Sequence, residues 1–213
     1  MKRALIIISC AVLLFVGIFR ISYKVDSTLL NVIKQFEMRN TVVIDAGHGG
    51  KDGGTIGIDG SCEKAINLSI ALDLYDFLAV SGIIVDLTRN GDYELYNAGE
   101  KRNKSDLYNR LDYINSKSNA VLISIHQNHF ENENEWGTQI WYSENDEKSK
   151  ILADKILFSI KQNLQQDNKR ENKPSGDDYY LLHKASVPSV MIECGFMSNT
   201  KKKKKLQDIE YQK

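Results

Sequence analysis

The sequence predicts an α/β protein, a three-layer sandwich in which helices flank a mostly parallel or mixed central sheet. Short β-branched apolar runs alternate with longer segments whose apolar residues recur every three or four positions. The short runs are apolar throughout rather than at every second position, which is typical of strands buried on both faces. Strands of that kind, alternating with helices, build a sheet that is covered on both sides.

The first half of the chain supplies two strands and two helices. A continuous apolar strand is expected over Thr41–Asp45, and another over Ile83–Thr88. Between them, a helix over Glu63–Val80 ends at Ser81-Gly82. Its core stripe has i, i+4 spacing and consists of Ile66, Ile70, Leu74 and Leu78. A second helix is expected over Asp106–Lys117.

The second half repeats the alternation around a polar loop at residues 165–178. That loop precedes the short segment Tyr179–Leu182. The other elements expected are the strands Ala120–His126, Gly137–Tyr142 and Ser189–Glu193, and a helix over Ser149–Leu164.

The composition predicts one compact domain and excludes an overall attraction to nucleic acid. The chain has 213 residues and 42% hydrophobic content, enough for a single core, expected over residues 41–213. Lysine plus arginine and aspartate plus glutamate number 28 each, so there is no net positive field. We therefore expect no nucleic-acid partner.

The N-terminus has the pattern of a signal-anchor or transmembrane segment, expected over residues 1–23. Met1-Lys2-Arg3 precedes an uncharged apolar run from Ala4 to Phe19, which Arg20 closes. The run falls just short of a hydrocarbon core of about 30 Å, and no small-residue cleavage site follows it. We expect an uncleaved anchor and a membrane-proximal stalk over residues 24–40. The protein would then lie outside the cytoplasm, either membrane-anchored or secreted.

Two histidines and a glutamate predict a metal site at one edge of the sheet. His48 and His126 follow apolar strands, and Glu63 opens a helix. Loops at the carboxyl ends of strands meet at one rim, so these side chains should converge. Two imidazoles and one carboxylate suit a catalytic zinc ion, which keeps a fourth position open for water.

Each of these residues also has a purely structural explanation. A strand-end histidine such as His126 is often structural, and a helix dipole favours an acidic residue such as Glu63 in the first turn. The loop around His48 is rich in glycine, as a phosphate-binding loop is. However, Asp52 and Asp45 stand where the dinucleotide and Walker spacings need glycine. An ordinary glycine turn does not account for the embedded histidine.

Further candidates surround this set. Glu193 ends a buried apolar run, where a carboxylate is costly without a partner, and it could act as a general base. Asn128 shares a strand face with His126 and could contact a substrate amide. Arg89 and Arg110 could contact substrate, and buried structural ion pairs would explain them equally well.

Two cysteines outside the N-terminal segment each adjoin a proposed site carboxylate. Cys62 and Cys194 are second-choice zinc ligands, since Cys194 should point to the opposite face of its strand from Glu193. Two cysteines allow one disulfide, but they do not form the disulfide framework typical of small secreted domains. We favour the interpretation that both cysteines are small buried apolar side chains.

Several strings taken together resemble the zinc-dependent N-acetylmuramoyl-L-alanine amidases of the amidase-3 family. The resemblance runs from about Thr41 to the C-terminus. It rests on Ile44-Asp45-Ala46-Gly47-His48-Gly49-Gly50, Glu63-Lys64 with Asn67-Leu68, Thr88-Arg89, Ser124-Ile125-His126 with Asn128, and Pro188 with Glu193, Gly195-Phe196 and Ser198-Asn199.

The resemblance implies a function and a set of roles. His48, Glu63 and His126 would bind zinc, and Glu193 would be catalytic. The substrate would be peptidoglycan, cut between the muramoyl lactyl group and L-alanine. In its short anchor and its lack of a wall-binding repeat, the chain resembles the spore-cortex subgroup of the family, which prepares muramic-δ-lactam. That would place the protein in the forespore intermembrane space.

Two other functions stay open at this point. One is a non-catalytic or partner-dependent wall-binding module of the same fold. The other is a zinc carboxypeptidase acting on the stem peptide, since a His, His, Glu set also suits that chemistry.

The C-terminus departs from the family pattern. Lys201–Lys205 stand where relatives carry an acidic residue, and the helix dipole disfavours cations in a first turn, for which Asn199 is the expected N-cap. One expectation is a frayed, solvated tail. The other is an incomplete edge that weakens zinc binding until further residues or an activating partner protein complete it.

Overall fold

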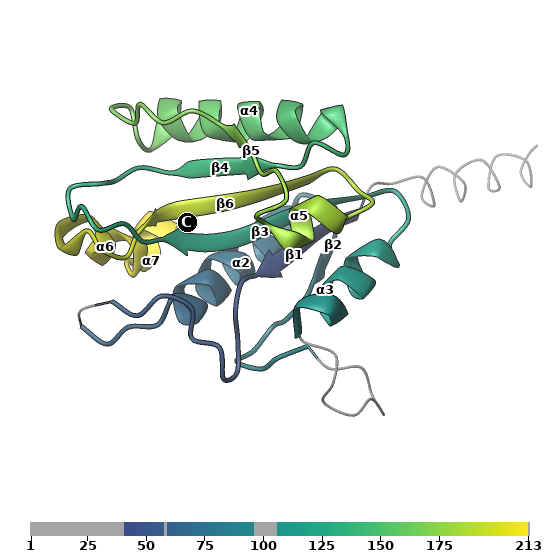
Figure 1. The fold of residues 1–213 in the computed structure, drawn as a ribbon, viewed down its shortest axis with the longest axis horizontal. Helices are drawn as coiled ribbons and strands as arrows, with labels where there is room; N and C mark the ends of the chain where they lie inside the picture. The colour runs from purple at the N-terminus through teal and green to yellow at the C-terminus, as the bar shows by residue number, and fades with distance from the viewer. Residues whose placement is uncertain (1–40, 58, 96–105, 213) are drawn as a thin grey trace, which may run out of the picture. The chain divides into compact units, whose positions relative to one another are not determined.

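The computed structural model describes residues 41–57, 59–95 and 106–212, and these form a six-stranded sheet flanked by helices (Figure 1). The strands are β1 (Thr41–Ala46), β2 (Ile84–Leu87), β3 (Ala120–Asn128), β4 (Gln139–Tyr142), β5 (Lys173–Pro174) and β6 (Ser189–Phe196). The helices are α2 (Glu63–Val80), α3 (Asp106–Asn115), α4 (Glu147–Asn163), α5 (Tyr180–Lys184), α6 (Thr200–Leu206) and α7 (Ile209–Gln212).

The sheet is mixed, and its topology creates a crevice between β1 and β3. The strand order is β2-β1-β3-β6-β4-β5, and β4 runs antiparallel to β6 while the other neighbours are parallel. From β1 the chain passes through α2 to β2 on one side, and then through α3 to β3 on the other. Such a reversal of strand order opens a ligand crevice at the carboxyl ends of the strands.

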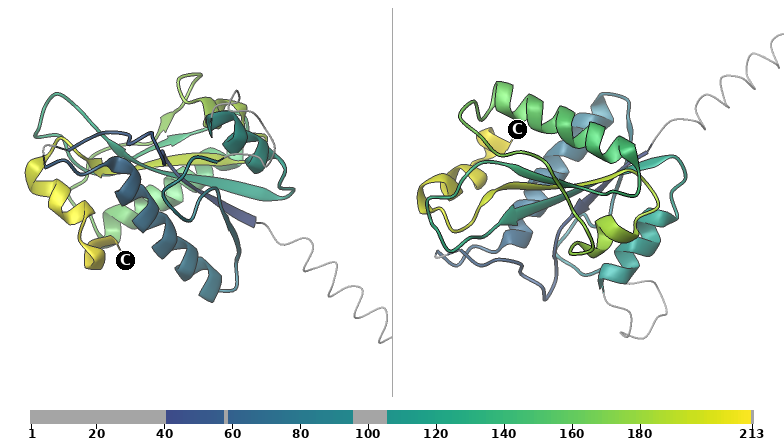
Figure 2. Two further views of the ribbon diagram at one scale, coloured as in Figure 1. Left: turned by 90° about the horizontal axis from the view of Figure 1, so that it is seen from below. Right: turned by 45° about the horizontal axis from the view of Figure 1, so that its top comes forward.

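Helices cover both faces of the sheet, which confirms the predicted three layers. One core joins Val43, Leu122 and Met191 of the sheet to α3 and α5. The other joins the alternate residues, including Ile44 and Ile123, to α2 and α4. Figure 2 shows α3 and α5 on the opposite side of the sheet from α2 and α4. The period of two along each strand decides which helix a side chain meets.

The structure extends or replaces several predicted elements. β3 continues to Asn128 and β6 to Phe196, because these ends pair with each other across an irregularity after His126. α4 begins at Glu147, since the side chain of Asp146 accepts a hydrogen bond from Lys148 N and caps it. The loop at residues 165–178 contains the short strand β5, and the segment after it forms helix α5.

The predicted anchor and stalk, residues 1–23 and 24–40, lie outside the described residues and remain predictions. Within the part of the chain that is described, no helix is both long and apolar enough to cross a membrane.

A buried carboxylate at the end of β1 organises the crevice. Asp45 is fully buried and accepts hydrogen bonds of 2.7 Å each from Thr88 Oγ1, Ser124 Oγ and Arg110 Nη1. Burial by itself would raise the pKa of Asp45, but the charge of Arg110 and the hydroxyl donors lower it to about 2. Of the two explanations open for Arg110, the structure shows the buried ion pair.

Replacing Asp45 with Asn should lower the free energy of unfolding by about 3–5 kcal/mol at neutral pH, because Arg110 would lose its buried counter-charge. The folded pKa is below the ordinary value of 3.8, so the stabilisation is complete above about pH 4 and is lost as the pH falls through about 2. Urea unfolding at several pH values measures this. The difference in the free energy of unfolding between wild type and variant should be largest at neutral pH and should disappear in acid. Equal stability at pH 7 would contradict the role of the ion pair.

Candidate active site

Three predicted metal donors meet at the carboxyl end of the sheet. His48 follows β1, His126 lies in β3, and Glu63 is the first residue of α2. One donor atom from each lies within 4.8 Å of the others. Glu63 Oε1 is 3.0 Å from His126 Nδ1 and 3.4 Å from His48 Nε2.

A strained backbone and two polar contacts position His48. Its φ is +62°, a left-handed conformation that few residues other than glycine adopt. Arg110 Nη2 donates to the His48 carbonyl oxygen at 2.6 Å, which helps to hold this conformation. His48 Nδ1 lies 2.7 Å from Asp52 Oδ2, so that nitrogen donates to the carboxylate and Nε2 is directed to Glu63.

Glu63 is buried and held through both carboxylate oxygens. Oε1 accepts from Gln127 N at 2.9 Å and Asn67 Nδ2 at 3.2 Å, and Oε2 accepts from Thr55 N at 2.9 Å. Burial alone would raise the pKa of Glu63, but hydrogen bonds to His126 and His48 hold it well below its usual range. The carboxylate is therefore ionised and pre-oriented before any ligand arrives.

The imidazole of His126 occupies the space above Gly47. A Cβ on Gly47 would lie 2.2 Å from His126 Nε2. The rings of His126 and His48 meet edge to face, with centroids 4.9 Å apart. Glycine at position 47 is thus required by close approach rather than by its own turn.

The donor set fits a zinc ion. Zinc–ligand distances of ~2.0–2.2 Å in a tetrahedron place neighbouring ligand atoms roughly 3.3–3.6 Å apart. The separations of 3.4 Å and 3.0 Å from Glu63 Oε1 are close to this range. Burial lowers the pKa of His48, but hydrogen bonds and charge from Glu63 and Asp52 outweigh burial and raise it to about 9. The three side chains His48, Glu63 and His126 together therefore attract a positive charge.

Comparison with known proteins identifies the family. Residues 42–213 match the family described as N-acetylmuramoyl-L-alanine amidase, Amidase_3. The chain belongs to this amidase family.

Individual relatives agree with the assignment. The germination-specific N-acetylmuramoyl-L-alanine amidase of Bacillus subtilis is 31% identical over 80% of this chain and 73% of its own length. The solved CwlD amidase of Clostridioides difficile, in complex with the GerS lipoprotein, is 41% identical with a TM-score of 0.76, covering 82% of this chain and 91% of that one. An N-acetylmuramoyl-L-alanine amidase from Clostridium difficile 630 is 30% identical with a TM-score of 0.70, covering 82% and 89%.

Glu193 lies in β6, at the same end of the sheet as the three donors. It pairs with His126 across β3 and β6, and it lines the same cavity of about 420 Å³ as the three donors. Its side chain is 8% exposed, and Oε2 has no hydrogen-bond partner among the described residues. Burial raises the pKa of Glu193 to about 7, while the two imidazoles oppose that rise.

The two predicted substrate contacts lie in different surroundings. Asn128 is half-buried and lines the cavity with Glu193. Arg89 is 1% exposed, and among the described residues it donates to the backbone carbonyls of Ala46, Gly47, Lys64 and Gly91, at 2.8–3.0 Å. These bonds give Arg89 a structural role, and its contact with substrate stays a prediction.

Both cysteines are free thiols outside the donor group. Cys194 faces away from Glu193 and packs against the core that includes α2 and α4. Burial raises the pKa of its thiol to about 12, which suits a small apolar side chain better than a zinc ligand.

Asp52, Asn67 and Thr55 were not predicted as part of the site. They orient His48 and Glu63 by hydrogen bonds. The motif Glu63-Lys64 with Asn67-Leu68 was visible in the sequence, and Asn67 lies one helical turn after Glu63. Asn67 is fully buried beside the predicted core stripe and also donates to the Gly47 carbonyl. The motif was therefore the signal that the sequence offered.

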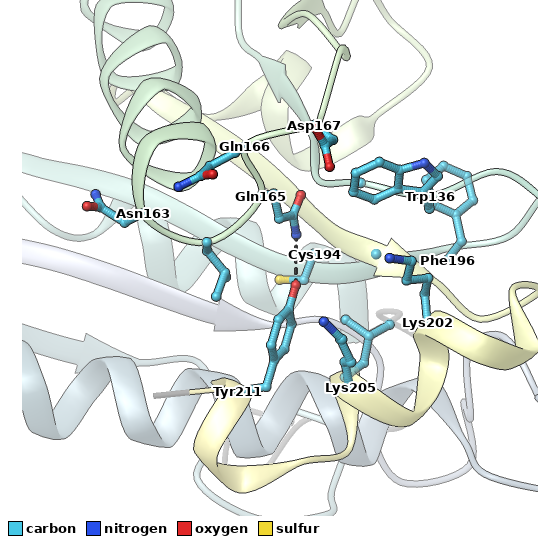
Figure 3. Close-up of a pocket in the computed structure, with 14 residues that line it drawn as sticks. Trp136, Asn163, Gln165, Gln166, Asp167, Cys194, Phe196, Lys202, Lys205 and Tyr211 are labelled. Atoms are coloured by element: carbon cyan, nitrogen blue, oxygen red, sulfur yellow. Dashed lines mark hydrogen bonds between the residues drawn. The ribbon is translucent and has the colours of Figure 1, made fainter.

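The predicted frayed tail is wrong for residues 200–206 and 209–212, which form α6 and α7. Asn199 caps α6 by accepting from Lys202 N at 2.9 Å, as expected. Leu206 packs with Ile66 of α2 and with Met197. Figure 3 shows the hydrogen bond of 3.1 Å from Gln165 to the Tyr211 hydroxyl, across a pocket of about 270 Å³ on the Cys194 side of β6. This edge is therefore covered by the chain's own C-terminal residues.

Gly47→Ala should displace the His126 ring and weaken zinc binding by about 10–100-fold, the usual cost of losing a ligand's orientation. Gly53→Ala is a matched control in the same loop, because its Cβ would make an ordinary contact 3.7 Å from Cys62 Sγ. Chelator competition after zinc loading measures both affinities. Equal affinity in the two variants would argue against His126 as a donor.

Proposed function

We propose that this chain is a zinc-dependent peptidoglycan amidase that hydrolyses the bond between N-acetylmuramic acid and L-alanine. His48, Glu63 and His126 would hold the zinc ion, and Glu193 would be the catalytic carboxylate. The family match supports the reaction. The observation that carries the roles is the buried Glu193 oxygen, which has no hydrogen-bond partner in the described part of the chain and lies in the same cavity as the three donors.

The residues present would bind and polarise an amide substrate. When bound, zinc supplies a Lewis acid for the carbonyl oxygen and lowers the pKa of a water molecule. Two neutral imidazoles and one carboxylate leave the loaded site with a net positive charge, which favours the developing oxyanion. Asp52 and Asn67 would keep His48 and Glu63 aligned during turnover.

Glu193 would move the proton. Its free Oε2 would accept a proton from the attacking water and deliver it to the nitrogen of the leaving L-alanine. A carboxyl whose pKa lies above its ordinary value is suited to hold that proton between the two steps.

The alternative functions make different products. A wall-binding module would need neither the zinc donors nor a free carboxylate, and both are present. A carboxypeptidase would release a terminal amino acid from the stem peptide. Mass analysis of digested peptidoglycan separates the three: free stem peptides with N-terminal L-alanine support the proposal, whereas released terminal residues or intact material would reject it.

Glu193→Gln should retain zinc and the fold but lose about 10²–10⁴-fold in kcat, because an amide cannot accept the water proton. Glu63→Gln is the matched comparison, since it removes a donor and should lose the metal. Zinc content and turnover are measured on both. If Glu193→Gln lost zinc while Glu63→Gln kept it, the two roles would be exchanged.

A role in the spore cortex, in muramic-δ-lactam formation, is supported by the Bacillus germination-specific relative and by the Clostridioides CwlD structure. The lipoprotein seen with CwlD supports a protein partner for this chain as well. We propose an extracytoplasmic location, with the N-terminal segment as membrane anchor. Deletion of the gene, followed by analysis of spore muropeptides for muramic-δ-lactam, tests the cortex role.

A further inference from the structure

One lysine of the C-terminal run is buried, unlike its neighbours. Lys203 is 5% exposed, whereas Lys202, Lys204 and Lys205 are exposed. Burying a lysine is costly unless its charge is paired. The Lys203 ammonium bonds to Asp59 Oδ1 and, at 3.1 Å, to Ser61 Oγ.

The acceptors of Lys203 lie at the tip of a small hairpin that carries Glu63. Ile56 and Cys62 pair as an antiparallel bridge. At the base, Glu63 N donates to Thr55 O and Thr55 N donates to Glu63 Oε2, both at 2.9 Å. The hairpin therefore holds one oxygen of a proposed metal donor, and α6 holds the tip of the hairpin.

A glycine makes room for this contact. A Cβ on Gly57 would lie 2.4 Å from Lys203 Nζ and 2.9 Å from Ser61 Oγ. Gly57 N also donates to Ser61 O at 2.8 Å, which closes the tip of the hairpin. The loop therefore leaves room for the lysine ammonium, which is buried although its partner Asp59 is half exposed.

We infer that Lys203 is a positioning residue for the metal site: it clamps the hairpin formed by residues 55–57 and 59–63, so that Thr55 N–H holds Glu63 in its ligating orientation. The inference rests on the proposed zinc site. Under this inference, helix α6 has a function: its contact with the hairpin raises the affinity of the site for zinc.

The lysine run supplies its own control. In the full 213-residue chain, Lys203→Met should raise the zinc dissociation constant about tenfold, and Lys204→Met, which removes the same charge from an exposed site, should leave it unchanged. Lys203→Arg should restore most of the affinity, because a guanidinium can still pair with Asp59. Chelator competition measures all four proteins.

Two further measurements separate positioning from general stability. Gly57→Ala keeps every charge but displaces the ammonium, so it should reproduce the loss of affinity even if Lys203→Met folds poorly. Urea unfolding of the metal-free proteins is the second measurement: Lys203→Met should still unfold cooperatively although its zinc affinity has fallen, whereas a loss of folding that matches the loss of affinity would contradict a positioning role.

The outcomes are distinct. If Lys203→Met and Gly57→Ala bind zinc as tightly as Lys204→Met, the clamp is rejected while the amidase proposal stands. If the wild-type chain itself binds no stoichiometric zinc, the proposed metal site and the clamp are both rejected.

Discussion

The buried ion pair between Asp45 and Arg110 fixes the backbone from which the site is built. Arg110 bonds to the Asp45 carboxylate and to the carbonyl oxygens of Ala46 and His48, and Arg89 bonds to those of Ala46 and Gly47. Two guanidinium groups thus satisfy consecutive carbonyls at the point where β1 ends. In a buried loop these groups would otherwise lack partners, at a cost of about 1–3 kcal/mol each. The strained conformation of His48 is tolerated because these hydrogen bonds hold the backbone on both sides of it in place.

The electrostatics of the crevice follow from the different partners of two buried carboxylates. Glu63 is held in its ionised form by two imidazoles and by backbone amides, whereas one oxygen of Glu193, at the same edge, has no hydrogen-bond partner among the described residues. Two carboxylates in different surroundings acquire different proton affinities, and such a separation is how a site divides a ligand from a general base. Strand pairing of His126 with Glu193 places the two roles next to each other.

The C-terminal residues belong to the same unit as the site. α6 and α7 pack on α2 through Leu206 and Tyr211, and α2 begins at Glu63. Cations near a helix N-terminus are unfavourable, and the Lys203–Asp59 pair offsets part of that cost. A short helix with cations near its N-terminus is therefore stabilised by tertiary contacts, as is usual for short helices.

The sequence by itself determined the fold class and the order of the main strands and helices, and it predicted the four residues proposed for the chemistry, because apolar periodicity and the polar residue that interrupts it are local signals. It left Arg89 and Arg110 open between substrate and structure, and it gave no account of Asp52, of Lys203 or of helix α5. Those depend on contacts between distant positions: Arg110 and Asp45 are 65 residues apart, and Lys203 and Asp59 are 144. Only the tertiary structure brings such groups together, since burial and pairing of a charge are set by what packs around it and not by its neighbours in the chain.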